Sequence, residues 1–299
     1  MKKTQLKKTI KLFLPFIILC TIFSCQKEVD DFGAVVNPPN PTNDSIYLDK
    51  IYEVYDAGTG LDTQSVLTVS YDAQKRITGW VSSDNSGLLE SSTYFYNSSD
   101  TIPFKTLLID HFNSIPDTTA SYFTYDASGR NLSDSSYTYY HTSGNSITST
   151  FSYSYVTGKR YGTGKKVITQ TTPVIYNYID TVALDASGNF LSSARYSDYN
   201  SGMMELTSTA NFTYDNKVSP FARQNIYKAH QQSPNGETLF YEYLSYNNML
   251  THIETIVTTG TTTFNDNIGY NFNSNNLPVK ATITFGTDTT YLLYTYKPL

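Results

Sequence analysis

One short phrase, an aromatic or aliphatic residue followed by Asp and a turn, recurs along this chain and limits what it can fold into. It is clearest in FTYDASGRNLSDSSYTYY, residues 123–140, where alternating aromatic residues stand on both sides of the tetrad Asp126 to Gly129. Asp at the first position of a type I turn accepts local backbone N–H bonds, and Gly at the fourth adopts a positive φ. Such a turn commonly joins two antiparallel strands. The phrase therefore predicts a β-hairpin.

Copies of the phrase occur from end to end of the chain. The clear copies begin at Tyr71, Tyr125, Leu184 and Tyr214, and weaker ones at Tyr96, Tyr246 and Phe272. Consecutive copies lie roughly 25 to 32 residues apart, which is enough for two strands and two connections. We therefore expect about eight hairpins.

The composition agrees with a fold made of strands. Only 16% of residues are charged, whereas the chain has 27 Tyr, and aromatic residues favour strands. We predict an all-β domain over residues 46–299, a long curled antiparallel meander with one face folded over the core. An open sheet of this size should curl, split into two layers or partly close. The expected core residues are Leu107, Leu108, Ile109, Phe151, Tyr153, Tyr155, Val167, Ile168, Ile253 and Ile283.

The Asp-containing tetrads have a second interpretation as calcium loops. A calcium site needs six or more converging oxygens, and Asp-Ala-Ser-Gly supplies one carboxylate per loop. Turn chemistry accounts for every residue of the tetrad, so we favour the turn. The stretch Gly162 to Lys166 lacks the length and the Ser or Thr of a phosphate loop and is interpreted as a hairpin tip.

The N-terminus has the pattern of an export signal. Five Lys precede the apolar run LFLPFIILCTIF, which is too short for a convincing transmembrane helix. Residues 22–25 (Ile-Phe-Ser-Cys) resemble a bacterial lipobox, which implies cleavage after residue 24 and lipid attachment to Cys25. An ordinary signal peptide with an incidental Cys is the alternative. We expect residues 1–24 to be a signal peptide and residues 25–45 a lipidated, Pro/Asn-rich tether.

Net charge and cysteine content limit the kinds of partner and bound group that the chain can have. Without residues 1–24 the chain keeps 16 Lys and Arg against 26 Asp and Glu, a charge of about −10. An acidic chain does not favour nucleic acid, so the expected membrane contact is the lipid on Cys25. Cys25 would be the only Cys left, which excludes an internal disulfide and a Cys-based metal site. We expect no cofactor and no metal.

The repeated phrase and the lipobox together resemble known families. Tyr122 to Leu132 and Val182 to Leu191 resemble the YD repeats of Rhs-type surface proteins and toxins, although the copies here are degenerate and no toxin domain follows. The combination with a lipobox is similar to uncharacterised Bacteroidota outer-membrane lipoproteins. The resemblance implies an extended antiparallel sheet and no established activity. The acidic residues Glu28, Asp30 and Asp31 resemble a surface-export signal of such lipoproteins, so surface exposure is also expected.

A transmembrane β-barrel is the alternative to this interpretation. The alternation of Phe151, Tyr153 and Tyr155 is compatible with a lipid-facing strand. However, many strands carry Lys, His, Asp or Gln within the run, the C-terminus lacks a terminal aromatic residue, and a lipid anchor would be redundant.

No catalytic motif is present. The chain lacks a Gly-x-Ser-x-Gly nucleophile elbow and a His-Glu-x-x-His zinc motif, and its four His residues stand singly. Carboxylate pairs for glycoside hydrolysis depend on the fold, and the sequence selects none.

Tyrosine gives the remaining functional indication. Tyr137, Tyr139, Tyr241 and Tyr243 are candidate aromatic platforms for a sugar ring, and cross-strand pairing that only stabilises the sheet is the alternative. The favoured function is a surface-anchored, non-enzymatic binding or scaffold module for a glycan or a partner protein. An exported hydrolase acting on polysaccharide or cell-envelope material is the second hypothesis.

Overall fold

The protein is an antiparallel all-β structure. The computed structural model describes residues 46–56, 61–199, 202–222, 245–257 and 260–299, and these residues form sixteen strands. The strands are β1 (Ile46–Asp56), β2 (Leu61–Tyr71), β3 (Ile77–Asp84), β4 (Gly87–Phe95), β5 (Lys105–Asp110), β6 (Asp117–Tyr125), β7 (Asn131–Tyr140), β8 (Asn145–Val156), β9 (Lys159–Thr169), β10 (Val174–Leu184), β11 (Phe190–Ser197), β12 (Glu205–Val218), β13 (Asn247–Val257), β14 (Thr261–Phe272), β15 (Pro278–Phe285) and β16 (Asp288–Pro298). No helix of the described residues is long and apolar enough to cross a membrane.

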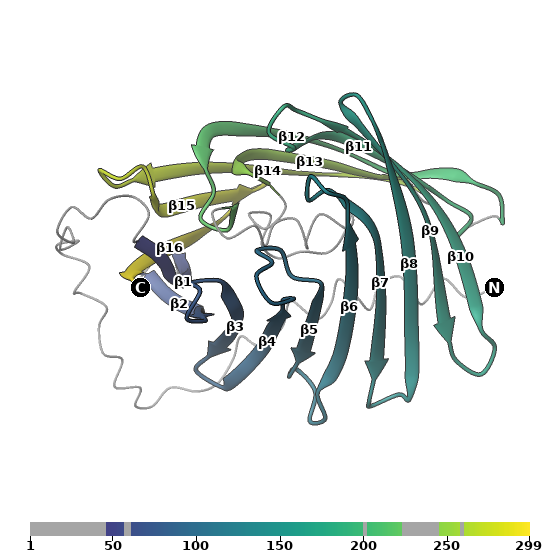
Figure 1. The fold of residues 1–299 in the computed structure, drawn as a ribbon, viewed down its shortest axis with the longest axis horizontal. Helices are drawn as coiled ribbons and strands as arrows, with labels where there is room; N and C mark the ends of the chain where they lie inside the picture. Colours follow the sequence, from purple (N-terminus) through teal and green to yellow (C-terminus); the bar gives the residue numbers. More distant parts are fainter. Residues whose placement is uncertain (1–45, 57–60, 200–201, 223–244, 258–259) are drawn as a thin grey trace. The chain divides into compact units, whose positions relative to one another are not determined.

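The strands form a meander that closes on itself. Each strand pairs antiparallel with its neighbours in the chain, and β1 pairs with β16 to complete a barrel (Figure 1). At this seam Ile51 lies opposite Tyr294 and Ile46 opposite Pro298. The predicted antiparallel meander is confirmed, but it is a closed barrel and not a curled sheet. Closure removes the two edge strands, whose unpaired N–H and C=O groups would otherwise invite association.

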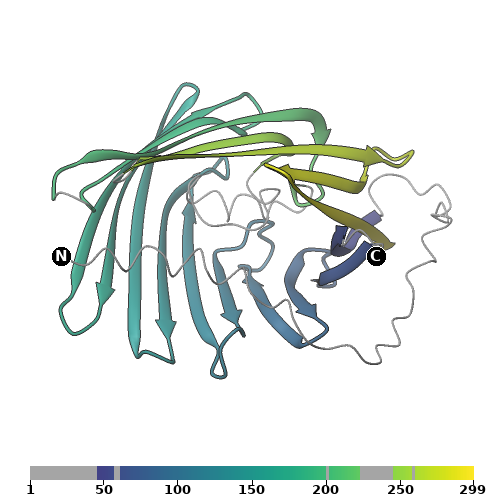
Figure 2. The same cartoon turned by 180° about the vertical axis from the view of Figure 1, so that it is seen from behind.

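The barrel has two rims, which the chain visits alternately (Figures 1 and 2). We call one the turn rim: β1 begins there, β16 ends there, and its connections include the predicted Asp turns. The described turn-rim connections are residues 72–76, 96–104, 126–130, 157–158, 185–189, 219–222, 245–246 and 273–277. We call the other the opposite rim, and its described connections are residues 85–86, 111–116, 141–144, 170–173, 198–199, 202–204, 260 and 286–287.

The core lies inside the barrel. Buried side chains from β1 to β4 form one cluster with buried side chains from β10 to β16. Ile51, Leu67 and Val182 are among the least exposed of these, and Trp80 donates a hydrogen bond from Nε1 to the Tyr94 hydroxyl at 3.2 Å. The single Trp is therefore a core residue whose polar atom has a partner.

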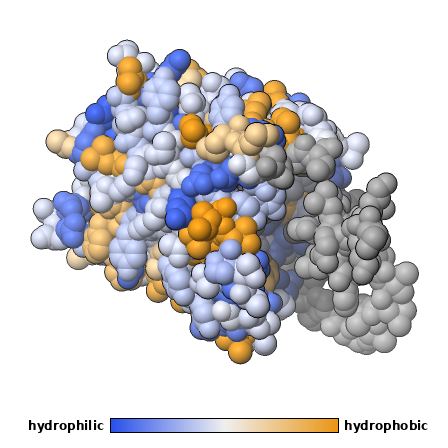
Figure 3. Space-filling view, turned by 90° about the vertical axis from the view of Figure 1, so that its right-hand side faces the viewer, coloured by the Kyte–Doolittle hydropathy of each residue, from blue (hydrophilic) through white to orange (hydrophobic). Residues whose placement is uncertain are grey.

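The outer wall of the barrel is polar along some strands, whereas others carry exposed apolar residues such as Tyr122, Ile175 and Ile179. On β8 the outward positions are Ser146, Thr148, Thr150, Ser152, Ser154 and Val156, and on β14 they are Thr261, Thr263, Asn265, Asn267, Gly269 and Asn271. Figure 3 shows a face on which hydrophilic surface separates small apolar clusters. The predicted core residues Phe151, Tyr153 and Tyr155 occupy the inward positions of β8. On β8, aromatic side chains therefore fill the inside, and mainly short polar ones face out.

Four of the expected core residues face the other way. Leu107 and Ile109 on β5 alternate with the inward Thr106 and Leu108, and Val167 and Ile253 are also outward. Neighbouring apolar residues in a strand point to opposite faces, so a continuous apolar run does not show which members are buried.

Two sequence interpretations of turns are wrong. Gly162 to Lys166 is not a hairpin tip but the middle of β9, and Tyr214 to Lys217 lies within β12. The glycines of β9 have a packing reason, because Gly162 and Gly164 lie opposite Tyr153 and Phe151 of β8. A Cβ at Gly164 would overlap the Phe151 ring, so the absent side chain makes room for an aromatic one.

Candidate functional site

The turns of the turn rim share one geometry. In the turns that begin at Asp72, Asp126, Asp185 and Asn273, the first residue donates N–H to the carbonyl of the fifth at 2.9–3.0 Å. Its side-chain Oδ1 accepts the N–H groups of the third and fifth residues at 2.8–3.0 Å. The fourth residue is left-handed, as Gly129 is with φ 77° and Gly188 with φ 85°. The turn interpretation of the tetrad is confirmed, and its carboxylate is occupied by the turn itself.

A tyrosine adds a second fixed contact at five of the strands that end on this rim. Its hydroxyl donates to a backbone carbonyl near the start of the previous strand at 2.7–3.0 Å. The pairs are Tyr71 to Leu48, Tyr96 to Ile77, Tyr125 to Pro103, Tyr155 to Asn131 and Tyr296 to Pro278. These bonds tie consecutive hairpins together, and they account for several of the tyrosines as structural residues.

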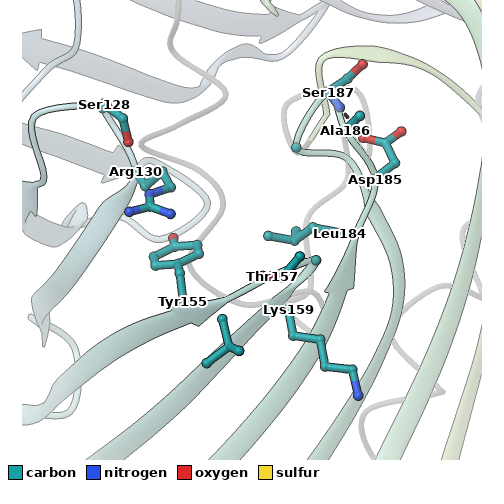
Figure 4. Close-up of a pocket in the computed structure, with 13 residues that line it drawn as sticks. Ser128, Arg130, Tyr155, Thr157, Lys159, Leu184, Asp185, Ala186 and Ser187 are labelled. Carbon is teal, nitrogen blue, oxygen red and sulfur yellow. Dashed lines mark hydrogen bonds between the residues drawn. The ribbon is translucent and has the colours of Figure 1, made fainter.

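Three connections of the turn rim border an open cavity of about 700 Å³. It is formed by residues 128–130, 155–159 and 184–188. Figure 4 shows Arg130 and the Tyr155 ring on one side and Leu184 on the other. A cavity of this size admits one or two sugar rings or another small polar molecule.

Arg130 is the positioned charge of this rim cavity. Its Nε donates to Asp126 Oδ2 at 2.6 Å, and its guanidinium lies 4.8 Å from the centre of the Tyr155 ring. More than half of the Arg130 side chain stays exposed, so the remaining N–H groups are accessible to a ligand. Desolvation opposes the ionised form of Asp126, but hydrogen bonds from Ser128 and Arg130 outweigh it and hold the pKa of this carboxyl well below its usual range.

The carboxylate that borders the cavity is not placed for acid–base chemistry. Asp185 accepts the N–H groups of Ser187 and Asn189 and the Asn189 amide, at 2.7–2.9 Å. Among the described residues, no group of three or more His, Cys, Asp or Glu side chains is arranged to hold a metal ion.

A second set of charged residues lines the inner wall away from the rim. Arg195 makes a bidentate ion pair with Asp180 at 2.7 and 2.8 Å, and Tyr153 donates to Asp134 at 2.6 Å. The Arg160 guanidinium lies within 5 Å of the centres of the Tyr153 and Phe190 rings.

Burial controls the protonation of this set. It raises the pKa of Asp134 to about 6, although the Tyr153 hydrogen bond and the nearby Arg160 lower it. Asp180 and Arg160 are almost completely buried, so we assign this set to supporting the wall and not to contacting a ligand.

The buried histidine also has a structural environment. His252 Nδ1 lies 3.0 Å from Asp266 Oδ2, and the His252 ring stacks on Phe212 at 5.1 Å.

The structure separates the tyrosines that the sequence proposed as platforms. Tyr137 and Tyr139 both face outward on β7, and Tyr139 packs edge-on against His141 at 4.6 Å. Neither lines the rim cavity. Tyr241, Tyr243 and Cys25 lie outside the described residues.

Sequence reasoning missed the residues of the rim cavity. Arg130 and Tyr155 were visible as members of repeated phrases, but their approach depends on which turns share a rim. The sequence signal that could have found them is the meander itself. In a meander, successive connections alternate between the two ends of the sheet, so every second connection lies at the same end.

The geometry defines the class of this protein as a closed sixteen-stranded antiparallel barrel with a ligand-sized cavity at one rim. A porin-like protein from Bacteroides vulgatus has a similar crystal structure, with a TM-score of 0.51 and 12% identity over 85% of this chain and 99% of that one. A second porin-like protein, from Bacteroides uniformis, gives a TM-score of 0.43 and 17% identity over 87% of this chain and 99% of that one. No protein-family description matches the sequence, and a search of curated proteins gave no match. The similarity to the first protein concerns the fold.

Proposed function

We propose that this chain is a non-enzymatic binding protein of the bacterial outer membrane, tethered by lipid on Cys25. The lipobox-like sequence before Cys25 supports the tether, and Glu28, Asp30 and Asp31 support export to the surface. The name porin-like, carried by the Bacteroides vulgatus structure of the same fold, supports an outer-membrane address.

The polar outer faces of β8 and β14 are the observation that carries this proposal. A membrane-spanning barrel needs an outward apolar band about 25 Å tall. Here β8 and β14 present mainly Ser, Thr and Asn outward, while Phe151 and Tyr153 face inward. Burying these hydroxyl and amide groups in lipid would leave them without hydrogen-bond partners. The outer faces of these two strands favour a barrel in water, with the lipid on Cys25 as its membrane attachment.

The attachment is tested with the full chain and its Cys25→Ser variant. Both are expressed in a bacterium that processes lipoproteins, and membranes are washed at alkaline pH. We expect wild type in the outer-membrane fraction and the variant in the soluble envelope fraction, folded by circular dichroism. A variant that stays in the membrane after the wash would show that the wall itself is inserted.

The rim cavity is the proposed binding site, and a glycan is the proposed ligand. Tyr155 and Leu184 supply apolar surface for a sugar ring, while Arg130 and the hydroxyls of Ser128 and Ser187 can bond its hydroxyl or carboxylate groups. The ion pair with Asp126 holds Arg130 in place before binding, which reduces the entropy cost.

A matched arginine tests this site. Arg76 has the same turn, with Nε donating to Asp72 at 2.7 Å and its guanidinium 4.5 Å from the Tyr96 ring, but it does not line the cavity. Neutral and uronic-acid oligosaccharides are added to the chain carrying Cys25→Ser, and the thermal midpoint is measured. We expect at least one sugar class to raise the midpoint of this chain and of Arg76→Ala, but not of Arg130→Ala. A rise that survives Arg130→Ala would place the site elsewhere, and no rise with any sugar would reject a glycan.

A further inference from the structure

The two rims of the barrel differ in their exposed side chains. The opposite rim carries exposed apolar residues in two connections, Phe112 and Ile115 in one and Tyr199 and Met203 in the other. Phe112 and Met203 are each about two-thirds exposed. The turn-rim connections that the structure describes hold no comparable exposed aromatic or aliphatic side chain, although Leu132, Val156, Leu191 and Leu299 are exposed in or just beyond the strand ends beside them. Single exposed apolar residues are ordinary, but their concentration at one end marks an interaction surface.

The exposed apolar residues stand on connections with a fixed backbone. In the connection between β11 and β12, Asp198 accepts the backbone and side-chain N–H groups of Asn177 at 2.8 and 2.7 Å. In the connection between β5 and β6, Phe112 donates its backbone N–H to Asp110 at 2.9 Å. These hydrogen bonds order the backbone at Phe112 and Asp198 before any partner arrives, which lowers the cost of binding there.

Charge also differs between the rims. Acidic residues on the opposite rim include Asp62, Asp84, Asp110, Asp198, Glu205 and Asp288. The described connections of this rim, and the two strand residues on either side of each, contain no Lys or Arg. The turn rim carries both signs of charge: Lys75, Arg76, Lys105, Arg130, Lys159 and Lys297 lie in or beside its connections together with Asp72, Asp100, Asp126 and Asp185.

This difference argues against lipid as the occupant of the opposite rim. Anionic membrane surfaces attract Lys and Arg and repel an acidic rim. The chain from Cys25 also enters the barrel at the turn rim, where β1 begins at Ile46. An apolar surface ringed by carboxylates is complementary to a protein that presents apolar side chains among basic ones.

We propose that the opposite rim is the docking surface for a second envelope protein, whose contact face is apolar and rimmed by Lys and Arg. The apolar contacts of Phe112 and Met203 supply affinity, and the surrounding carboxylates supply orientation and a fast encounter. This surface is separate from the rim cavity, because the two lie at opposite ends of the barrel.

Photo-crosslinking in living cells identifies the occupant. A photoreactive phenylalanine replaces Phe112 or Met203 in the full lipidated chain, and the same residue at Leu299, which follows β16 at the turn rim and does not line the rim cavity, is the control. We expect Phe112 and Met203, but not Leu299, to give one discrete adduct with a different protein. No adduct, equal adducts at Leu299, adducts only with lipid, or an adduct of two copies of this chain would each overturn the proposal.

The captured protein must then bind in purified form. Its affinity for the chain should fall about tenfold or more between roughly 50 and 500 mM salt, because the charged contacts are exposed. Glu205→Lys combined with Asp288→Lys should weaken binding by a similar factor, whereas Lys75→Glu, at the turn rim and outside the rim cavity, should not. Binding that ignores both salt and the reversed charges would reject the basic partner.

Discussion

At the scale of single residues, the repeated phrase divides two tasks between neighbouring side chains. The Asp organises the turn by accepting two backbone N–H groups, as Asp126 does from Ser128 and Arg130. The Tyr before it anchors the hairpin to the previous strand, as Tyr125 does by donating to the Pro103 carbonyl at 3.0 Å. Neither task needs a ligand, so the phrase is explained by folding alone.

The left-handed fourth residue of the turn gives two opposite stability predictions, one for Lys75 and one for Gly188. Lys75 holds this position with φ 65°, where Gly188 has φ 85°. A left-handed conformation costs a residue with a Cβ about 1 to 2 kcal/mol, offset in part by the flexibility of Gly in the unfolded chain. We expect Lys75→Gly to exceed Lys75→Ala in stability by about 1 kcal/mol, and Gly188→Ala to lose about as much, measured by urea unfolding. Equal stability of the two Lys75 variants would contradict this.

Residue-level chemistry was predictable where it is local. The turn at Asp126 follows from four consecutive residues, and so does the one at Asp185. The role of Tyr155 does not, because its partners Asn131 and Arg130 are supplied by another hairpin. The direction of Tyr137 depends on register and closure, which no short window of sequence contains.

At the scale of elements, β9 shows how composition misleads. Gly162, Gly164 and two lysines suggest a flexible tip, yet this stretch is a central strand paired along its length with β8 and β10. The glycines are needed by the neighbouring strand, since the Phe151 and Tyr153 rings lie over them. A strand glycine that receives an aromatic ring from the next strand is recognisable only when the pairing register is known.

Alanine substitution separates this role from ordinary strand propensity. We expect Gly164→Ala to destabilise the barrel by about 1 to 3 kcal/mol, because the new methyl displaces the Phe151 ring. Gly269 faces outward on β14, and a Cβ there would meet nothing within 4 Å. Gly269→Ala should therefore be neutral or stabilising by up to about 1 kcal/mol. Thermal unfolding of the two variants compares them, and an equal loss in both would remove the packing explanation.

At the scale of the whole molecule, the sequence did not determine whether the sheet closes into a barrel. Both faces of many strands carry apolar residues, as Leu107 and Leu108 show on β5, so alternation alone does not choose between a curled sheet, two layers and a barrel. The decision comes from pairing β1 with β16, a contact between the two ends of the described chain. The all-β meander was predictable, whereas its inside and outside were not.

Stability of the barrel as a whole should depend on pH through a pair of carboxylates near the opposite rim. Glu90 lies directly across from Asp110. Burial, and to a lesser extent the charge of Asp110, raises the pKa of Glu90 from 4.5 to about 7. Glu90 is then protonated in the fold at a pH where the unfolded chain ionises it, so its stabilising contribution is lost as pH rises from 4.5 through 7.

The Glu90→Gln variant tests this prediction, because its amide does not titrate. The thermal midpoint of wild type should fall relative to that of Glu90→Gln between pH 5 and pH 8. A constant difference between the two proteins across this range would show that Glu90 does not titrate there. Asp72→Asn, in a turn of the other rim where hydrogen bonds lower the pKa, serves as a control that should not reproduce this trend.

The seam between β1 and β16 also sets the order in which strand pairs form during folding. Every strand pairing except that between β1 and β16 joins neighbours in the chain, so those hairpins form rapidly by local contacts. The seam is the exception, because Ile51 waits for Tyr294 until the last strand arrives. During that interval both ends are unpaired edges, which are the sites where misassembly begins. The folding chain should therefore be most prone to misassembly at the moment just before the barrel closes.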